Sequence, residues 1–368
     1  MHLKPMKLQE IFAQIPDPPI NRRKLHLLDD ILLLTLLAVI CGAESYEAIE
    51  LFGKSKLDFS KQIMPLPNGI PSHDTLERVF KRIDSSAFES AFLAWIKTLE
   101  ITTEGKIISI DGKTVRGSQD EKNGNYAIHL VSAWCSSNSL MLGQIKTASK
   151  CNEIKAVQQL LDLIDVEGGI ITIDAMGCQK DIAAKIKSRG ADYILAVKQN
   201  QETLYNEIGG AFAHKKAEHV FVSKHESDHG RIEQRTCSVI SQLSWIKEKD
   251  KWMGLSNIIK IEAGREVDGK TSTETRYYIS SVEQDAKSFN DNIRQHWGIE
   301  SSLHWTLDVQ FREDESRKRK GQSAENFAIV RRIALMLLKK KQLRRLGINN
   351  KRLMAGWDND FLLSLVLN

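Results

Sequence analysis

Paired cysteines, long apolar runs and low-complexity tracts are all missing from this 368-residue sequence. The five cysteines form no CxxC pair and are spread through apolar or mixed contexts, so we interpret them as the reduced thiols of a cytosolic protein. The most hydrophobic stretch, Ile31 to Cys41, is far too short to cross a bilayer. The amino terminus has no signal-peptide pattern. These absences predict a cytoplasmic protein without a membrane partner.

Positive charge is concentrated in one segment. The net charge is +5, and 42% hydrophobic with 27% charged residues is ordinary for a soluble chain long enough for two or three domains. From Arg317 to Arg352 there are thirteen Lys or Arg residues and one acidic residue, Glu325, so this segment carries about +12 and the remainder about −7. Such a local excess suits binding to a phosphate backbone. A solvated basic helix is the alternative.

Two aspartates each follow a short run of β-branched apolar residues. Asp111 follows residues 107–110 (IISI), and Asp174 follows residues 170–173 (IITI). This pattern predicts buried strands whose carboxylates emerge at the carboxyl edge of a sheet, although an Asp after a strand is more often a turn or cap residue. Adjacent carboxylates repel unless a cation lies between them, and oxygen ligands without a Cys or His pair favour magnesium or manganese over zinc. The pattern indicates phosphoryl transfer on a nucleic acid.

The residues around these aspartates, and around a third carboxylate, carry a family resemblance. Asp111 opens the sequence DGKTVRGS, Asp174 opens DAMGCQ, and Glu300 ends RQHWGIE and is followed by SSLHWTLDV. The chain resembles the insertion-sequence transposases of the ISAs-one type, also called H-repeat-associated proteins, within the Asp-Asp-Glu (DDE) transposases. The resemblance covers nearly the whole chain, from residues 17–23 (DPPINRR) to 326–335 (NFAIVRRIAL), with the motifs in the expected order.

This resemblance implies an α/β fold with a ribonuclease H-like catalytic core. Asp111, Asp174 and Glu300 would be the catalytic residues and would hold two Mg²⁺ or Mn²⁺ ions roughly 3.5–4 Å apart, with Asp111 bridging both ions. The implied reaction is metal-dependent cleavage and strand transfer of an insertion sequence. The implied partners are double-stranded DNA, as terminal inverted repeats and target DNA, and a second copy of the chain in a homodimer.

Two other functions use the same residues. A ribonuclease H-like nuclease or resolvase needs the triad without strand transfer, whereas a domesticated DNA-binding protein keeps only the basic surfaces. The intact triad disfavours the second. A third pattern, His-Glu-x-x-His at residues 225–229, matches zinc proteases. Its residues are poor helix formers and its flanks resemble the strands of a hairpin, so we expect a strand pair there and no protease.

The helix predicted to carry Glu300 presents a polar stripe. Four polar residues recur at every fourth position and share one helical face: His296, Glu300, His304 and Asp308. A stripe facing a metal site would explain them. For the histidines we favour the alternative, in which Trp297, Trp305 and Ile299 pack on the sheet and the histidines form ordinary, partly exposed hydrogen bonds. Related transposases carry Tyr, Arg, Glu and Lys at fixed offsets around this position, where this chain has Ile293, His296, Glu300 and Leu307, so the Glu is kept and its usual basic neighbours are not.

Six basic residues are candidates for DNA contacts: Lys113, Arg116, Arg231, Arg235, Arg317 and Arg319. The first two follow Asp111 closely enough to meet a scissile or flanking phosphate, although strand alternation equally points one of them away. The second pair belongs to a basic turn at residues 229–235 (HGRIEQR), which looks like a family motif. The last two open the basic segment.

Helix and strand signals divide the chain into five parts. These are a helical domain suited to binding DNA ends, the first part of the core, a β-rich insertion, the second part of the core with the Glu-bearing and basic helices, and a tail: 1–103, 104–199, 200–284, 285–340 and 341–368. Helix starts are predicted at four caps: Asp29 or Asp30, Ser45, Ser72 and Ser85. The insertion is predicted because the interval from Asp174 to Glu300 is too long for an uninterrupted core.

Overall fold

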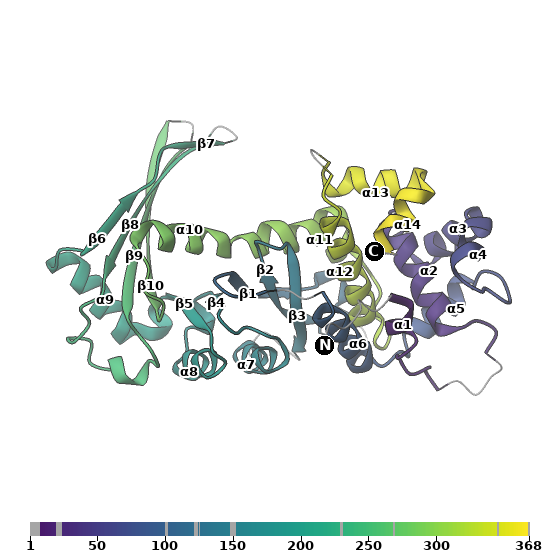
Figure 1. Ribbon diagram of the computed structural model, residues 1–368, viewed down its shortest axis with the longest axis horizontal. Coiled ribbons are helices and arrows are strands. Elements are labelled where there is room, and N and C mark those ends of the chain that lie inside the picture. Colours follow the sequence, from purple (N-terminus) through teal and green to yellow (C-terminus); the bar gives the residue numbers. More distant parts are fainter. Residues whose placement is uncertain are drawn as a thin grey trace.

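The computed structural model describes the chain in nine stretches: residues 8–19, 24–99, 102–120, 124, 126–147, 152–228, 231–267, 269–343 and 346–366. The molecule is elongated, with a large sheet at one end and a helical region at the other (Figure 1). The predicted mixed α/β fold, preceded by helices, is confirmed. No helix among the described residues is long and apolar enough to span a membrane.

A single sheet runs through much of the molecule. Its ten strands, counted over the described residues, follow the order β3-β2-β1-β4-β5-β10-β9-β8-β6, and β7 pairs with β8 off this path. The first five strands, β1 to β5, have the bounds Ile107–Thr114, His129–Cys135, Leu140–Thr147, Ile170–Ile173 and Asp192–Val197. β2 pairs antiparallel with both β1 and β3, whereas β4 pairs parallel with both β1 and β5. The isoleucine runs of β1 and β4 are buried because helices cover both faces.

The strands predicted as an insertion extend this same sheet. β6 to β10 have the bounds His219–Val222, Glu226–Asp228, Arg231–Ile240, Asn257–Val267 and Lys270–Ser280. β10 pairs antiparallel with β5, from Tyr277 opposite Val197 to Ser280 opposite Ile194. We call β6 to β10 the arm; its strands rise on the left of Figure 1. The arm is therefore joined to the core by backbone hydrogen bonds rather than by a flexible linker.

Helices cover the two faces of the sheet differently. α7, α8 and α9 pack on one face and α10 on the other, with the bounds Glu153–Leu163, Lys180–Ser188, Glu202–His214 and Ala286–His296. Ile108 belongs to the core under α7 and α8, whereas Ile107 and Ile170 belong to the core under α10. Because side chains alternate along a strand, Asp111 shares the face of Ile107, and Asp174 shares the face of Ile170. Both aspartates therefore lie on the α10 face.

The helical region is built from both ends of the chain. Its N-terminal helices, α1 to α6, are Leu8–Phe12, Leu28–Ile40, Tyr46–Ser55, Leu57–Ile63, His73–Phe80 and Ser85–Lys97. Its C-terminal helices, α12 to α14, are Ser323–Lys340, Ile348–Trp357 and Asn359–Val366. All nine contribute to one hydrophobic core. α12 is the central element, because it packs against α2 and α6 and also against β3.

The helix starts agree only in part with the predicted caps. Ser45 and Ser72 cap α3 and α5 as predicted. The prediction for α2 is wrong, because this helix begins earlier and Asp30 lies buried within its first turn, where its carboxylate accepts a hydrogen bond from a loop amide at 3.0 Å. For α6 the cap is Asp84 rather than Ser85. Asp84 accepts hydrogen bonds from the amides of Ser86 and Ala87, which fixes the start of α6 one residue earlier than predicted.

Candidate active site

Parallel pairing of β1 with β4 brings the two aspartates together. Ile110 lies opposite Ile173, so Asp111 and Asp174 follow at the same edge of the sheet. Asp174 also caps a short 3₁₀ turn: its Oδ1 accepts hydrogen bonds from the backbone amides of Met176 at 3.0 Å and Gly177 at 3.4 Å. Asp174 is therefore a cap and still has a second carboxylate oxygen for another partner.

Glu300 lies on an unusual helical turn. It is the first residue of a π-helical turn, Glu300–His304, which joins α10 to α11 (Trp305–Gln310). Single π turns within α-helices occur frequently at functional sites. Ile299 is fully buried and anchors the turn, whereas Glu300 is exposed at its start. Trp297 and Trp305 are 36% and 56% exposed. The prediction that both pack on the sheet is wrong for Trp305, whereas the centre of the Trp297 ring lies 4.7 Å from the guanidinium of Arg276 in β10.

The three carboxylates share one electrostatic environment. Burial, and then the charges of Asp174, Glu300 and Glu153, together raise the pKa of Asp111 to about 7, although the hydrogen bond from the Gly112 amide opposes this shift. Among the residues described, no group of three or more His, Cys, Asp or Glu side chains is close enough to hold an ion. The site therefore gathers negative charge without a closed ligand set. Its oxygen donors fit a hard divalent cation, which would relieve the repulsion.

Glu153 and His129 also lie beside Asp111 and Gly112, and neither residue was predicted from the sequence. His129 Nε2 lies 3.1 Å from Glu153 Oε2, and both side chains are buried. A Cβ atom at Gly112 would lie 2.5 Å from His129 Nε2 and 2.7 Å from Glu153 Oε1. Gly112 is therefore required by close packing beside Asp111. This glycine is the one local signal of a neighbour there, and it does not reveal which residues approach.

The two histidines of the polar stripe are not ordinary surface residues. His296 Nδ1 lies 2.9 Å from Thr172 Oγ1, and His304 Nδ1 lies 3.5 Å from Asp111 Oδ2. Burial lowers the pKa of His296 to about 4 and that of His304 to about 3. Both imidazoles are therefore neutral at pH 7. The favoured alternative of partly exposed histidines is wrong for His304, which is buried, and both histidines face the strands that carry the aspartates.

Lys113 is itself buried and faces three acidic side chains rather than solvent, and one of these acids, Glu313, is fully buried. Its side chain is 7% exposed, and its Nζ lies 2.6 Å from Asp308 Oδ1, 3.0 Å from Asp314 Oδ1 and 3.8 Å from Glu313 Oε2. Glu313 Oε1 accepts a hydrogen bond from Arg332 Nη1 at 2.7 Å. Burial alone would raise the pKa of Glu313, but Arg332 and Lys113 hold it below its ordinary value. These charges join β1 to α11 and α12.

The remaining basic candidates differ in their surroundings. The Arg116 side chain is 85% exposed, and Arg317 makes no hydrogen bond or ion pair with any residue that the structure describes. Arg319 Nε donates to the Gly117 carbonyl at 2.9 Å. Arg235 is paired with Glu233 at 2.6 Å. Arg231 begins β8, and its side chain lies outside the described part of the chain.

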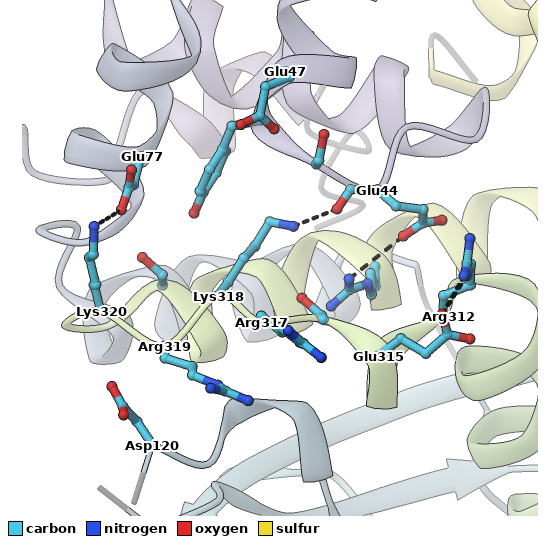
Figure 2. Close-up of a pocket in the computed structure, with 15 residues that line it drawn as sticks. Glu44, Glu47, Glu77, Asp120, Arg312, Glu315, Arg317, Lys318, Arg319 and Lys320 are labelled. Atoms are coloured by element: carbon cyan, nitrogen blue, oxygen red, sulfur yellow. Dashed lines mark hydrogen bonds and ion pairs between the residues drawn. The ribbon is translucent and has the colours of Figure 1, made fainter. Parts of the chain in front are cut away.

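A cavity of about 650 Å³ lies between the helical region and residues 312–320. Figure 2 shows the side chains that line it. Lys318 points into the helical region, where its Nζ donates to the Glu44 carbonyl at 2.5 Å and lies 4.0 Å from the centre of the Phe327 ring. Arg317 and Arg319 project from the other side of this extended segment (Figure 2). Lys318 is thus an internal anchor, whereas Arg317 is exposed and Arg319 is half-buried on the other side of the segment.

The His-Glu-x-x-His pattern does not form a helix. Glu226–Asp228 is strand β7 and pairs with β8, as expected for a strand pair. Glu226 forms an ion pair with Arg294 of α10. His229 lies outside the described residues. A zinc-protease site requires both histidines on one helical turn, so the strand geometry disfavours it.

Comparison with known proteins identifies the family. Residues 102–337 match the model described as Transposase DDE domain, and residues 9–96 match the one described as DDE_Tnp_1-associated. The chain belongs to the DDE transposase family and is a DNA transposase. This family acts on DNA and generally uses divalent metals.

The relatives include proteins named for the H repeat. The chain is 43% identical over 357 residues to "Putative transposase YncI" of Escherichia coli O157:H7, covering 94% of this chain and 90% of that one. It is 41% identical over 376 residues to "H repeat-associated putative transposase YhhI" of Escherichia coli K12, covering 100% and 98%. The resemblance drawn from the sequence motifs is confirmed.

Proposed function

We propose that Asp111, Asp174 and Glu300 are the catalytic residues of a ribonuclease H-like core that cleaves DNA at the ends of an insertion sequence and transfers the freed strand to a target. The observation that carries this proposal is the convergence of the three acids, from β1, β4 and the π turn, in one environment where the pKa of Asp111 is raised to about 7. The order of three antiparallel strands followed by two parallel ones supports the assignment of the core.

The three carboxylates would hold two Mg²⁺ or Mn²⁺ ions. When bound, these ions supply activation of a water or a 3′-hydroxyl and stabilisation of the leaving oxygen. Asp111 is influenced by both other acids, which suits it to a shared position between them. Asp174 keeps one oxygen on the amides of its own turn and offers the other. Glu300, exposed at the start of the π turn, completes the set from the opposite element.

DNA would lie across the edge of the sheet where the aspartates emerge. Arg116, Arg317 and Arg319 are the strongest candidates for phosphate contacts: Arg116 is 85% exposed although its Nε lies 3.7 Å from Asp314 Oδ2, Arg317 is exposed, and Arg319 donates to a backbone carbonyl. Lys113 and Arg235 are weaker candidates, because acidic neighbours already balance their charges. A cavity of about 790 Å³ beside Asp174 is lined by further basic and aromatic residues and extends the same surface toward the arm: Lys198, Arg276, Tyr205 and Tyr277. The active assembly would be a homodimer, with one site for each element end.

The test combines isosteric variants with a paired-end assay. Asp111→Asn, Asp174→Asn and Glu300→Gln should each abolish metal-dependent cleavage of element-end DNA while preserving DNA binding, because each removes a ligand oxygen at nearly constant volume. Asp181→Asn, an exposed carboxylate on α8, is the matched control and should cleave normally. Full activity in any triad variant would remove that residue from the site. Cleavage without joining of the two ends to target DNA would instead favour the nuclease or resolvase alternative.

A further inference from the structure

The proposed triad accounts for Glu300 in the polar stripe but not for the other three members of the stripe. We propose that His296, His304 and Asp308 are positioning residues that fix the register of this helix against the two aspartate strands. His304 acts on Asp111 directly, and the other two act on its neighbours. The inference rests on the proposed role of Asp111, Asp174 and Glu300.

Each member of the stripe meets a strand position at or two residues from an aspartate. His296 contacts Thr172, two residues before Asp174; His304 lies beside Asp111 itself. Asp308 contacts Lys113, two residues after Asp111, at 2.6 Å. Since strand side chains repeat every two residues, all of these positions lie on the one face that the helix covers. A shift of the helix by one turn would break all three contacts together.

The π turn keeps this stripe aligned. In an α-helix, residues four apart drift by roughly 40° around the axis, so three such steps would carry Asp308 roughly 120° away from the face of His296. The wider π turn over Glu300–His304 holds an extra residue in its hydrogen-bonded ring and offsets part of this drift. The irregularity at Glu300 therefore brings residues on both sides of it onto the same strands.

Two features favour this one position of the helix along the strands over its alternatives. Lys113 is buried among several acids, of which Asp308 is the nearest, and a buried ion whose partner is removed is strongly unfavourable. His304 Nε2 is buried without a hydrogen-bond partner among the described residues, so Nδ1, toward Asp111, is its polar contact. Partners that orient a ligand carboxylate typically change metal affinity when they are removed.

The orientation of His304 gives a sharp test. The amide nitrogen of Asn can replace Nδ1 of a histidine, whereas that of Gln replaces Nε2. His304→Asn should therefore preserve cleavage of element-end DNA by the full-length protein, whereas His304→Gln should raise the Mg²⁺ or Mn²⁺ concentration for half-maximal cleavage by about 10- to 100-fold. Asp308→Asn should shift the metal requirement in the same direction. Val309→Ala, a change at the exposed next position, is the control and should leave the metal requirement unchanged.

Binding of element-end DNA without metal, and the melting temperature, are measured for every variant. A purely structural role would lower the melting temperature while leaving the metal requirement of the folded protein unchanged, and that result would overturn the inference. Equal metal requirements for His304→Asn and His304→Gln would also overturn it. If Asp111→Asn remained fully active, the proposed triad would be wrong. If Asp111→Asn were inactive while His304→Gln and Asp308→Asn had the metal requirement of the wild type, the positioning role would be rejected and the proposed triad would stand.

Discussion

The two halves of the basic segment Arg317–Arg352, residues 317–330 and 331–352, are both positively charged, but their surroundings differ. Near its start, Arg317 is exposed and without a described partner. Further along, Arg332 is fully buried, and Lys351 and Arg352 are each 6% exposed. Arg352 Nη2 donates to the Val39 carbonyl at 3.0 Å and to Glu44 Oε1 at 2.7 Å. Positive charge alone therefore does not identify a DNA-binding surface, because the buried half holds the helical region together.

Replacing Arg332 should produce the largest loss of stability. Arg332→Met leaves Glu313 buried without its closest partner, and breaking a buried pair in this way typically costs about 3–5 kcal/mol. The free energy of unfolding in urea measures this loss. Arg317→Met is the matched control and should change it by less than about 0.5 kcal/mol. Equal effects of the two changes would erase the distinction between the halves.

A smaller loss is expected at Lys351. Its Nζ donates to the Leu338 and Lys341 carbonyls at 2.8 Å each, at the end of α12. Lys351→Met leaves both acceptors without this donor, at a cost of about 1–3 kcal/mol. The same urea titration checks the value. An unchanged unfolding free energy would show that other donors replace the ammonium.

Replacing Asp111 should raise the stability of the protein rather than lower it, because the charge of this partly buried carboxylate faces other acids. Its folded pKa of about 7 lies above the ordinary value of 3.8, so the folded state keeps a proton that the unfolded state has lost between these values. The stability from this group is present below pH 3.8 and is lost as pH rises through 7. In metal-free buffer at pH 8, Asp111→Asn should therefore melt at a higher temperature than the wild type. Melting curves from pH 5 to 8 should show this advantage growing with pH; an advantage independent of pH would contradict the assignment.

The exposed half should affect binding and not stability. Arg317→Gln with Arg319→Gln should weaken binding to element ends and to unrelated duplex DNA nearly equally, because phosphate contacts carry no sequence information. Each lost contact should flatten the slope of log affinity against log salt by about 0.9. Lys318→Met is the contrast: its ammonium is held by Glu44 and Phe327, so the salt slope should remain and the stability should fall. If Lys318→Met flattened the salt slope and the double arginine change did not, Lys318 would be the DNA contact and the two arginines would be structural.

Local patterns predicted much of the fold, and the misses have physical causes. The apolar runs before Asp111 and Asp174 gave both strands, because β-branched residues in short runs favour buried strands wherever they pack. The strands after α9 were predicted as a β-rich insertion, but that prediction did not include the pairing of β10 with β5, by which they continue the sheet. Strand pairing depends on which edge is open, and no local pattern records that.

The sequence by itself determined the family, the two strand ends with their aspartates and the four-residue spacing of the stripe, because each depends on residues close together in the chain. Only the tertiary structure decided which charges are buried: Arg332 meets Glu313, and Lys113 meets Asp308. It also placed Glu153 behind Gly112 beside Asp111. The physical reason is that burial and charge pairing depend on contacts between distant segments, so identical lysines and arginines acquire different roles according to the acids and helices that the fold brings to them.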